Sequence, residues 1–268
     1  MSYVGGKSKG ATHILEILNH PYFDGFDYLE PFVGMGHILR RVINKHITIA
    51  SDYNPLLCEL LNGIQQSKTI PIISRDQYQT LKHQVGSITF ERAIACFCYS
   101  YNGKAWGGYC PVFNSATRHD DYVKQRTNYY KSLQINPVFM NTRIECISFK
   151  GLNPSKQLIY CDPPYRSTTG YRIEAYKTPK DTFDHDDFWN TMRKWSQHNY
   201  VFISEYSAPV DFIEIGHSIK NTSLSGKGSS SQRIEKLFAH TSIMDSEFWD
   251  PAHGDLNHSL ESREHGCI

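Results

Sequence analysis

Residues 161–165 read Cys-Asp-Pro-Pro-Tyr and directly follow an apolar run, Leu-Ile-Tyr. The run predicts a short buried strand that ends in a rigid turn. Pro163 and Pro164 each fix a φ angle and remove a backbone donor. The turn therefore offers the carboxylate of Asp162, the carbonyl of Pro163 and the ring of Tyr165. Two acceptors beside an aromatic ring suit a flat molecule with an exocyclic amine, but this stretch alone fits a purely structural Pro-Pro turn equally well.

A glycine-rich turn follows another predicted strand in residues 28–36, Tyr-Leu-Glu-Pro-Phe-Val-Gly-Met-Gly. Gly34 and Gly36 let the backbone come close to a ligand, as in the first strand–loop–helix unit of a Rossmann-like sheet. A helix is expected over residues 37–45. A single Gly-x-Gly is weak evidence, so the next unit of the chain has to support it.

That next unit agrees with a nucleotide-binding sheet. Residues 47–52 predict a second strand, which ends in Asp52, sixteen residues past Gly36. An acid at this strand end is placed to bind the hydroxyl groups of a ribose. Asn54 and Pro55 then end the strand and start a helix.

Four motifs come in the order of the D12-class, Dam-like DNA adenine-N6 methyltransferases, and the chain resembles that family. Residues 202–209 and 233–238 look like its phage-type members, and the resemblance covers roughly residues 3–240. It implies an α/β fold: a Rossmann-like, S-adenosylmethionine-dependent methyltransferase sheet with a mostly helical DNA-recognition insertion. The motifs are Gly-Gly-Lys at 5–7, Glu-Pro-Phe-Val-Gly-Met-Gly at 30–36, Ser-Asp-Tyr-Asn-Pro at 51–55 and Asp-Pro-Pro-Tyr at 162–165.

The resemblance also implies a reaction and the residues that act in it. The reaction is methyl transfer from S-adenosyl-L-methionine to N6 of an adenine in double-stranded DNA. One departure concerns the adenine of the donor: Ser148 stands where family members often carry an acid, so this contact is expected from Phe149 and the backbone. The implied catalytic residues are Asp162, Pro163, Pro164 and Tyr165, and the implied donor-binding residues are Tyr3, Gly5, Gly6, Lys7, Glu30, Pro31, Phe32, Gly34, Gly36, Asp52, Ser148, Phe149 and Asp162.

The residue types of the turn suit this chemistry. Adenine N6 is a poor nucleophile because its lone pair is delocalised into the ring. Asp162 and the Pro163 carbonyl, accepting its two hydrogens, favour a tetrahedral nitrogen, and this stabilisation grows toward the transition state. Duplex DNA hides N6, so the base is expected to flip out at a cost of about a few kcal/mol. Stacking on Tyr165 offsets about 1–3 kcal/mol of that cost.

An unusually long segment separates the two halves of the expected sheet. Asp162 lies 126 residues after Gly36, more than a plain doubly wound fold needs. We expect residues 1–60 and 136–244 to form the catalytic domain and residues 61–135 to form an inserted target-recognition region. Glycine, aromatic and basic residues are interleaved in it, as in surfaces that touch phosphates and bases. A solvated helix with packed aromatic residues is the alternative. The expected DNA contacts are Lys104, Trp106, Arg118, Lys124 and Arg126.

Other elements are predicted from local patterns. Asp184 predicts the N-cap of a helix from His185 to about His198. Its apolar residues fall on one face of the helix. The remaining predicted elements are a helix at 90–99, strands at 142–147 and 200–204, a mobile loop at 166–172 and a flexible loop at 223–231.

The net charge of +1 over 268 residues hides an uneven distribution. Residues 245–268 hold six acidic residues and one basic residue, a net charge of −5, so the rest of the chain carries +6. A basic body with an acidic tail, which we expect to be flexible, fits a nucleic-acid partner. The seven cysteines include no Cys-x-x-Cys and predict reduced thiols in a cytoplasmic protein. The family resemblance implies that this is the cytoplasm of a bacterium or of a phage-infected host. Neither a metal site nor a membrane span is expected.

Three other functions stay open. Asp-Pro-Pro-Tyr turns also occur in RNA guanine-N2 and protein-glutamine methyltransferases, though usually without a large insertion between donor loop and turn. Related turns occur in cytosine-N4 methyltransferases, many of which carry the turn before the donor loop, unlike this chain. The third alternative is a catalytically silent DNA-binding module on the same fold. The intact Asp162 argues against it. The recognised DNA sequence, the biological role and the oligomeric state do not follow from the sequence.

Overall fold

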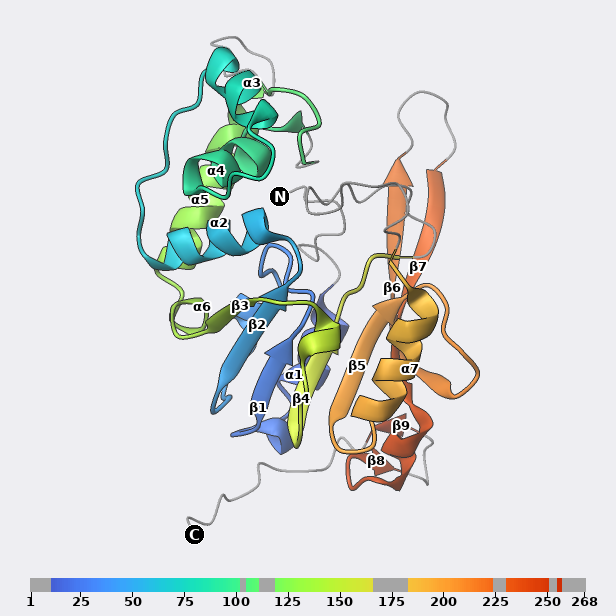
Figure 1. The fold of residues 1–268 in the computed structure, drawn as a ribbon. Coiled ribbons are helices and arrows are strands. Elements are labelled where there is room, and N and C mark those ends of the chain that lie inside the picture. Colours follow the sequence, from blue (N-terminus) through green and yellow to red (C-terminus); the bar gives the residue numbers. More distant parts are fainter. Residues whose placement is uncertain are drawn as a thin grey trace.

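The computed structural model describes residues 11–101, 105–110, 119–165, 183–223, 230–250 and 255–256. A seven-stranded sheet in the order β3-β2-β1-β4-β5-β7-β6 forms its centre (Figure 1). Strands β1 to β5 run parallel, and β7 is antiparallel to both β5 and β6. The strands are β1 (Asp27–Glu30), β2 (Thr48–Asp52), β3 (Arg143–Cys146), β4 (Gln157–Cys161), β5 (Tyr200–Glu205), β6 (Phe212–Ser223) and β7 (Ser230–His240), with a separate pair, β8 (Trp249–Asp250) and β9 (Asp255–Leu256).

The order of the strands reverses beside β1. The chain first places β2 and β3 on one side of β1 and then crosses over to place β4 and β5 on the other. Ligands of open α/β sheets bind outside the carboxyl ends of the strands at such a reversal. Leu29 of β1 pairs with Ile159 of β4, so both strands leave the sheet at the same edge. The topology confirms the predicted Rossmann-like α/β fold. The crevice that holds ligands in such folds is therefore expected between the loops after β1 and β4.

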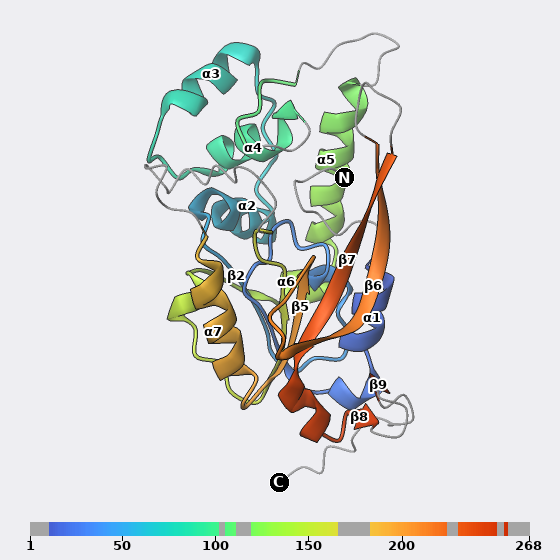
Figure 2. The same cartoon turned by 90° about the vertical axis from the view of Figure 1, so that its right-hand side faces the viewer.

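Apolar side chains cover both faces of the sheet, as parallel strands require. Helix α7 (His185–Trp195) packs on one face, and α1 (Thr12–Leu18) lies on the other (Figure 2). Phe188, Met192 and Trp195 point from one side of α7 into the core, as predicted. Burial of each such side chain contributes about 1.5–3 kcal/mol.

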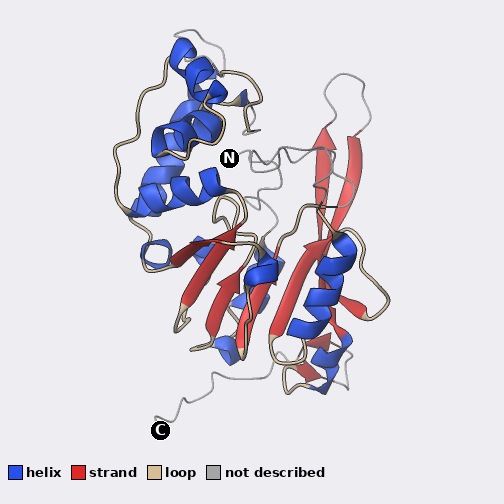
Figure 3. Cartoon of the chain, viewed as in Figure 1, coloured by secondary structure: helices blue, strands red, loops and turns tan. Residues whose placement is uncertain are grey.

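Helices α2 (Pro55–Gln65) and α7 begin directly after residues that the sequence marks as helix starts. The described helices are blue in Figure 3. Asn54 Oδ1 accepts the Leu56 N–H at 3.1 Å, and Asp184 Oδ1 accepts the Asp187 N–H at 3.0 Å. The other α-helices are α3 (Arg75–His83), α4 (Phe90–Cys98), α5 (His119–Gln134) and α6 (Pro137–Met140), and the 3₁₀ turns are η1 (Pro21–Phe23), η2 (Leu39–Arg41), η4 (Phe149–Gly151) and η5 (Thr241–Asp245).

The helix predicted over residues 37–45 is absent from this described segment. Only the 3₁₀ turn η2 forms there; the chain is extended at Val42 and left-handed at Asn44, with φ 57°. A non-glycine residue in the left-handed region interrupts an α-helix. The chain therefore reaches β2 through an irregular loop rather than through the helix of the usual unit.

Helices α3, α4 and α5 form a group beyond the carboxyl ends of β1 and β2 (Figure 1). Helix α2 connects this group to the sheet. Gly63 lets α2 and α4 approach closely, because a Cβ at this position would clash with the ring of Phe90. The group coincides with most of the segment that the sequence assigns to target recognition.

The packed core continues past residue 244, where the sequence predicts the tail to begin. Phe248 is 1% exposed, and its ring lies 5.3 Å from Tyr22 and 4.5 Å from Phe23. Trp249 is buried in β8. Large aromatic side chains dominate burial energetics, so the acidic segment begins with an aromatic anchor.

None of the described helices is long and apolar enough to cross a membrane. Within the same described ranges, no group of three or more His, Cys, Asp or Glu side chains is arranged to hold a metal ion.

Candidate active site

The loop after β1 makes a tight turn at the crevice. Gly34 and Gly36 have φ 52° and 68°, in the left-handed region that favours glycine. The Gly36 N–H donates to the Val33 carbonyl at 2.9 Å, and the Val33 N–H donates to the Ser51 carbonyl at 3.0 Å. These bonds tie the turn to β2, and the two glycines leave its backbone open to a ligand.

Asp52, at the end of β2, borders this turn. Its Oδ2 accepts the Gly34 N–H at 3.3 Å and its Oδ1 accepts the Asn54 N–H at 2.9 Å. Burial raises the pKa of the Asp52 carboxyl to about 6, and the backbone donors of Asn54 and Gly34 oppose this rise. Each carboxylate oxygen has a second acceptor site, so Asp52 can also accept hydroxyl groups of a ligand.

Glu30, the last residue of β1, lies buried at the same edge. Its Oε2 accepts the hydroxyl hydrogen of Tyr28 at 2.8 Å. Burial, followed by the charge of Glu30, raises the pKa of the Tyr28 hydroxyl well above its usual value. Tyr28 therefore remains a hydrogen-bond donor, and the Glu30 carboxylate is held in place at the end of the strand.

The turn after β4 brings together a carboxylate and a phenol. Tyr165 Oη lies 2.8 Å from Asp162 Oδ1 and also hydrogen-bonds Glu235 Oε1 on β7. Burial, then the charges of Asp162 and Glu235, raises the pKa of Tyr165 well above its usual value. The phenol therefore keeps its proton.

The ring of Tyr165 does not lie open for stacking in the described conformation. Tyr165 is 8% exposed, and the ring of Tyr206 meets it edge-on with centroids 4.9 Å apart. A base that stacks on Tyr165 needs an accessible ring face. The structure thus differs from the predicted stacking role, because the hydroxyl contacts turn the ring into the protein.

An aromatic group borders the crevice on the α7 side. The rings of Phe32 and Phe149 lie 5.5 Å apart, and Phe188 lies 5.7 Å from each. Ser148 caps the 3₁₀ turn η4, since its Oγ accepts the Lys150 N–H at 3.4 Å. Phe149, the predicted adenine contact, therefore lies beside Phe32 of the predicted donor loop, with Ser148 next to it in the chain.

The structure places the predicted DNA contacts in different surroundings. Arg126 is 1% exposed, and its guanidinium donates to the carbonyls of Cys98 and Ser100. This burial argues against the DNA contact predicted for Arg126, because the side chain stabilises the end of α4 instead. Lys124, two residues earlier on α5, is exposed and accessible to a partner.

Trp106 also packs within the insertion. Its ring lies 5.4 Å from Tyr78, and the Arg92 guanidinium sits 5.1 Å above it. The residue has φ 53° in a short hairpin closed by the bridge between Ser100 and Tyr109. Trp106 is therefore half-buried and packs against the insertion itself, so the DNA contact predicted for it stays a prediction.

Several predicted residues lie outside the described ranges. The mobile loop at 166–172 is among them, and the flexible loop at 223–231 is described only at its two ends, which belong to β6 and β7. The site residues concerned are Tyr3, Gly5, Gly6, Lys7, Lys104 and Arg118.

Comparison with known proteins bears on the segment that holds the glycine turn and Asp52. Residues 3–91 match the family model of the D12 class N6 adenine-specific DNA methyltransferases. The D12-class resemblance is confirmed. The Asp-Pro-Pro-Tyr turn and most of the insertion lie outside this match, so the roles of their residues remain predictions.

A curated relative matches a longer part of the chain. The type II methyltransferase M.FokI of Planomicrobium okeanokoites is 24% identical over 225 residues. The aligned region covers 72% of this chain and 32% of the relative, so the chain spans about a third of the length of M.FokI.

Solved structures resemble the chain only distantly. A putative RNA methyltransferase from Pyrococcus horikoshii aligns with a TM-score of 0.36 and 8% identity, covering 84% of this chain and 81% of the other. The rRNA methyltransferase aviRa from Streptomyces viridochromogenes aligns with a TM-score of 0.37 and 11% identity, covering 92% and 91%. Likenesses at this level carry no argument about function.

The glycine turn also contacts the insertion, through residues that the sequence did not single out. Tyr129 Oη on α5 donates to the Met35 carbonyl at 2.8 Å. The Tyr129 ring lies 4.7 Å from His37 and 5.1 Å from the Arg40 guanidinium. Burial lowers the pKa of His37 to about 4, so its imidazole is neutral near pH 7. Helix α5 thereby fixes the glycine turn from outside the sheet.

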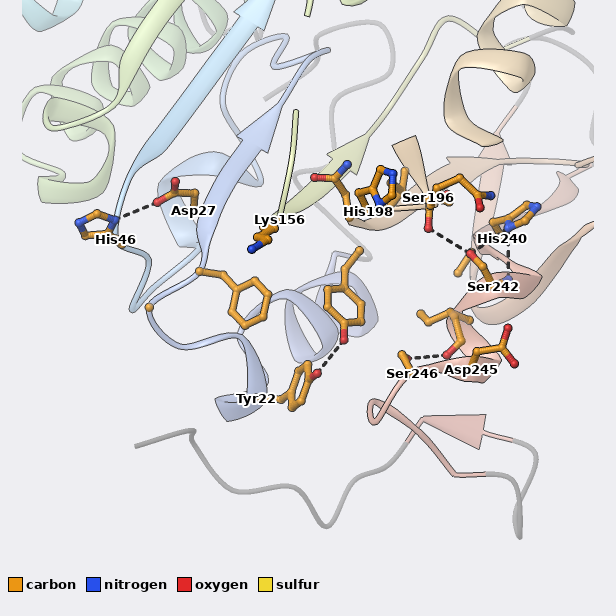
Figure 4. Close-up of a pocket in the computed structure, with 18 residues that line it drawn as sticks. Tyr22, Asp27, His46, Lys156, Ser196, His198, His240, Ser242, Asp245 and Ser246 are labelled. Carbon is orange, nitrogen blue, oxygen red and sulfur yellow. Dashed lines mark hydrogen bonds and ion pairs between the residues drawn. The ribbon is translucent and has the colours of Figure 1, made fainter. Parts of the chain in front are cut away.

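A pocket of about 650 Å³ opens at the opposite edge of the sheet, among the amino ends of β1, β4 and β5 (Figure 4). Its lining includes Lys156, His198 and the hydrogen-bonded pair of Asp27 and His46, whose Oδ1 and Nδ1 atoms lie 3.0 Å apart. The predicted site residues do not line it. Because ligands of this fold bind at the carboxyl ends of the strands, this pocket is not part of the candidate active site.

Proposed function

We propose that this protein is a site-specific DNA methyltransferase that transfers a methyl group from S-adenosylmethionine to N6 of an adenine flipped out of duplex DNA. One observation carries the proposal. The Asp-Pro-Pro-Tyr turn after β4 and the glycine turn of the D12-class segment after β1 flank the point where the strand order reverses. The donor site and the acceptor site of a transfer reaction have to lie side by side. The two turns are neighbours at this edge of the sheet.

The crevice residues fit the donor. Asp52 would accept the ribose hydroxyl groups, and Phe32 and Phe149 would flank the donor adenine. Gly34 and Gly36 would let the rest of the donor approach the backbone. S-adenosylmethionine, when bound, supplies a methyl group made electrophilic by its sulfonium.

The catalytic turn supplies acceptors for the exocyclic amine. Asp162 has more acceptor sites than the one that Tyr165 occupies. Pro163 contributes a carbonyl and has no N–H that could compete for it. These two acceptors would hold the two amine hydrogens and localise the nitrogen lone pair as the methyl group arrives, a stabilisation that grows toward the transition state.

Helix α5 and the hairpin at Ser100–Tyr109 would form the surface that meets DNA. Lys124 is exposed on α5, and Lys104, Trp106 and Arg118 remain proposed contacts of the same region. We propose that the protein acts on DNA in the cytoplasm of a bacterium or of a phage-infected host.

A methyl-transfer assay with labelled S-adenosylmethionine tests the proposal. Duplex DNA, single-stranded DNA, RNA and a glutamine-containing peptide serve as acceptors, with Asp162→Ala as the inactive control. We expect label in N6-methyladenine of duplex DNA at a defined sequence. Label in RNA or in glutamine would replace the proposed substrate, whereas DNA binding without any transfer would show a catalytically silent binding module.

A further inference from the structure

Two cysteine side chains meet where the insertion joins the sheet. Cys58 lies near the start of α2, and Cys146 is the last residue of β3. The Cys58 thiol donates to the Asp52 carbonyl, 3.4 Å from its sulfur, and the same sulfur lies 3.8 Å from the Glu145 carbonyl oxygen. Asp52 and Cys146 are direct partners in the pairing of β2 with β3. The Cys58 sulfur therefore lies against the pair of residues at which both strands end.

The side chain of Cys146 faces this sulfur. Successive residues of a strand point to opposite faces of the sheet, so Cys146 shares its face with Ile144. Ile144 packs against the core cluster that contains the buried side of α2. The thiols of Cys58 and Cys146 are hydrogen-bonded to each other. Two sulfur atoms in such contact need only a small movement to form a disulfide.

The two thiols differ in their access to solvent. Cys146 is exposed, whereas Cys58 is 2% exposed, and the other described cysteines are buried as well. Burial, followed by the charge of Asp52, raises the pKa of the Cys58 thiol, which therefore keeps its proton near pH 7. An oxidant dissolved in water reaches Cys146 first and leaves Cys58 as the thiol beside it.

We propose that Cys58 and Cys146 form a redox-sensitive pair that hydrogen peroxide converts into a disulfide. In the first step the Cys146 sulfur takes one oxygen from the peroxide: an S–O bond forms, the O–O bond breaks, and water leaves. The Cys58 sulfur then forms the S–S bond, the S–O bond breaks, and hydroxide leaves with the Cys58 proton as a second water. The two sulfur atoms together lose two electrons, which the peroxide gains.

The contact between the thiols favours the second step. A protonated, buried thiol is a weak nucleophile, but Cys58 is held beside the sulfur that it attacks. Such proximity gives a high effective concentration, which offsets a low intrinsic reactivity. In a cytoplasmic protein a disulfide of this kind is expected to be transient and to respond to oxidants.

The disulfide would close a ring around the insertion. Cys58 and Cys146 are 88 positions apart, and residues 61–135 lie between them. A cross-link over a loop of this length restricts the unfolded chain strongly, so the oxidised protein should be more stable than the reduced one. Formation of this disulfide does not depend on the proposed methyl transfer.

The test treats the full chain with hydrogen peroxide at neutral pH, blocks the remaining thiols and maps the peptides by mass spectrometry without reduction. We expect a cross-link between Cys58 and Cys146 that dithiothreitol reverses. The melting temperature of the oxidised protein should lie about 5 °C or more above that of the reduced protein. Cys58→Ser should keep a sulfenic acid at Cys146 that dimedone traps, and Cys146→Ser should form no disulfide at Cys58.

Cys267→Ser is the matched control, because it removes a cysteine outside the described ranges, and it should keep the cross-link. Loss of the cross-link in this variant would overturn the proposal. Sulfenic or sulfinic acid at Cys146 of the wild type, with Cys58 still a free thiol, would also overturn it, as would a covalent dimer through Cys146. These outcomes are measured on the wild type and on Cys267→Ser, so they decide the question even if Cys58→Ser does not fold.

Discussion

The guanidinium of Arg126 donates to the carbonyl of Ser100 at 2.7 Å, across 26 positions of the chain. The same guanidinium also donates to the carbonyl of Cys98, the last residue of α4. Carbonyls at the end of a helix have no partner within the helix. Arg126, whose positive charge is typical of DNA contacts, thus binds the carbonyl end of α4 and the first residue of the hairpin.

Removing this side chain should destabilise the protein. We expect Arg126→Ala to lower the free energy of unfolding by about 2–4 kcal/mol, because buried carbonyls lose their donors and the aliphatic stem loses its packing. Urea unfolding followed by far-UV circular dichroism measures the loss. A midpoint equal to that of the wild type would show that the guanidinium contributes nothing to the fold.

For Lys124, in the same helix, we expect the opposite: little effect on stability and an effect on DNA binding. Since it is exposed, Lys124→Ala should change stability by less than about 0.5 kcal/mol. If Lys124 touches a phosphate, the variant binds all duplexes more weakly, and the slope of log K against log salt falls by about one unit. Fluorescence anisotropy at several salt concentrations measures this slope, and an unchanged slope would remove Lys124 from the DNA surface.

Asp162→Ala should abolish transfer without loss of the donor site. The variant removes an acceptor that is used in the transition state, so kcat should fall far more than the donor affinity. Calorimetric titration with S-adenosylhomocysteine checks the donor site, and a single-turnover assay checks the chemistry. A rate within about tenfold of wild type, equal to about 1.4 kcal/mol, contradicts the proposed role.

Asp52 should make both stability and donor binding depend on pH. Its pKa is about 6 in the folded protein and 3.8 for an ordinary aspartate. Between these values the folded state binds more protons than the unfolded chain, so the free energy of unfolding decreases as pH rises through this window, by at most about 3 kcal/mol. Asp52→Asn should remove this part of the slope in urea unfolding from about pH 4 to about pH 7.

The donor affinity should change in the opposite direction over the same window. Below pH 6 the wild-type carboxyl gains a proton and loses acceptor strength toward the ribose, so the dissociation constant should rise as pH falls. Asp52→Asn should bind the donor more weakly and with no such pH dependence. Parallel pH profiles of the two proteins would place Asp52 outside the donor site.

Two adjacent tyrosines on α5 form a matched pair. Tyr129→Phe removes the bond to the Met35 carbonyl and should lower stability by about 0.5–1.5 kcal/mol. Tyr130 is also buried, but its hydroxyl has no partner among the described residues. Tyr130→Phe should therefore leave stability unchanged or raise it by about 1 kcal/mol. Thermal melts of both variants measure these changes in stability. The dissociation constant of Tyr129→Phe for the donor shows whether the bond to Met35 also orders the proposed donor loop.

The sheet and the strand-end residues follow from local sequence patterns. Apolar runs that end in an acid or in prolines identified β2 and β4, because strand formation and termination depend on neighbouring residues. The segment after Gly36 was mistaken for a helix, since the pattern of its apolar residues does not reveal the left-handed conformation of Asn44. Local patterns therefore identify where strands end better than how loops continue.

Contacts between distant segments explain what the sequence analysis missed. Glu235 lies 70 positions from Tyr165, and Tyr129 lies 94 positions from Met35. A signal for Glu235 does exist: it alternates with exposed Ile234 and shares the buried face of β7 with Leu237. A charged residue on the apolar face of a strand needs a polar partner, although the sequence does not reveal which one.

The position of Arg126 on α5 could also have been inferred from the sequence. Val123, Arg126, Tyr130 and Leu133 recur at helical spacing, and all four are buried. A basic residue within such a stripe faces the core, whereas Lys124 lies off the stripe. Residue type alone suggested a DNA contact for both.

The bond between Tyr129 and Met35 determines where this chain can be recombined with a relative to change its sequence preference. An exchange of residues 61–135 would remove α5 and separate Tyr129 from its acceptor in the glycine turn. An exchange of residues 66–110 alone leaves that bond in the host. It also preserves the role of Arg126, because the acceptors are backbone carbonyls, which any incoming sequence of the same fold provides. New specificities should therefore be obtained by shuffling the outer hairpin and its two preceding helices while α5 stays with the sheet.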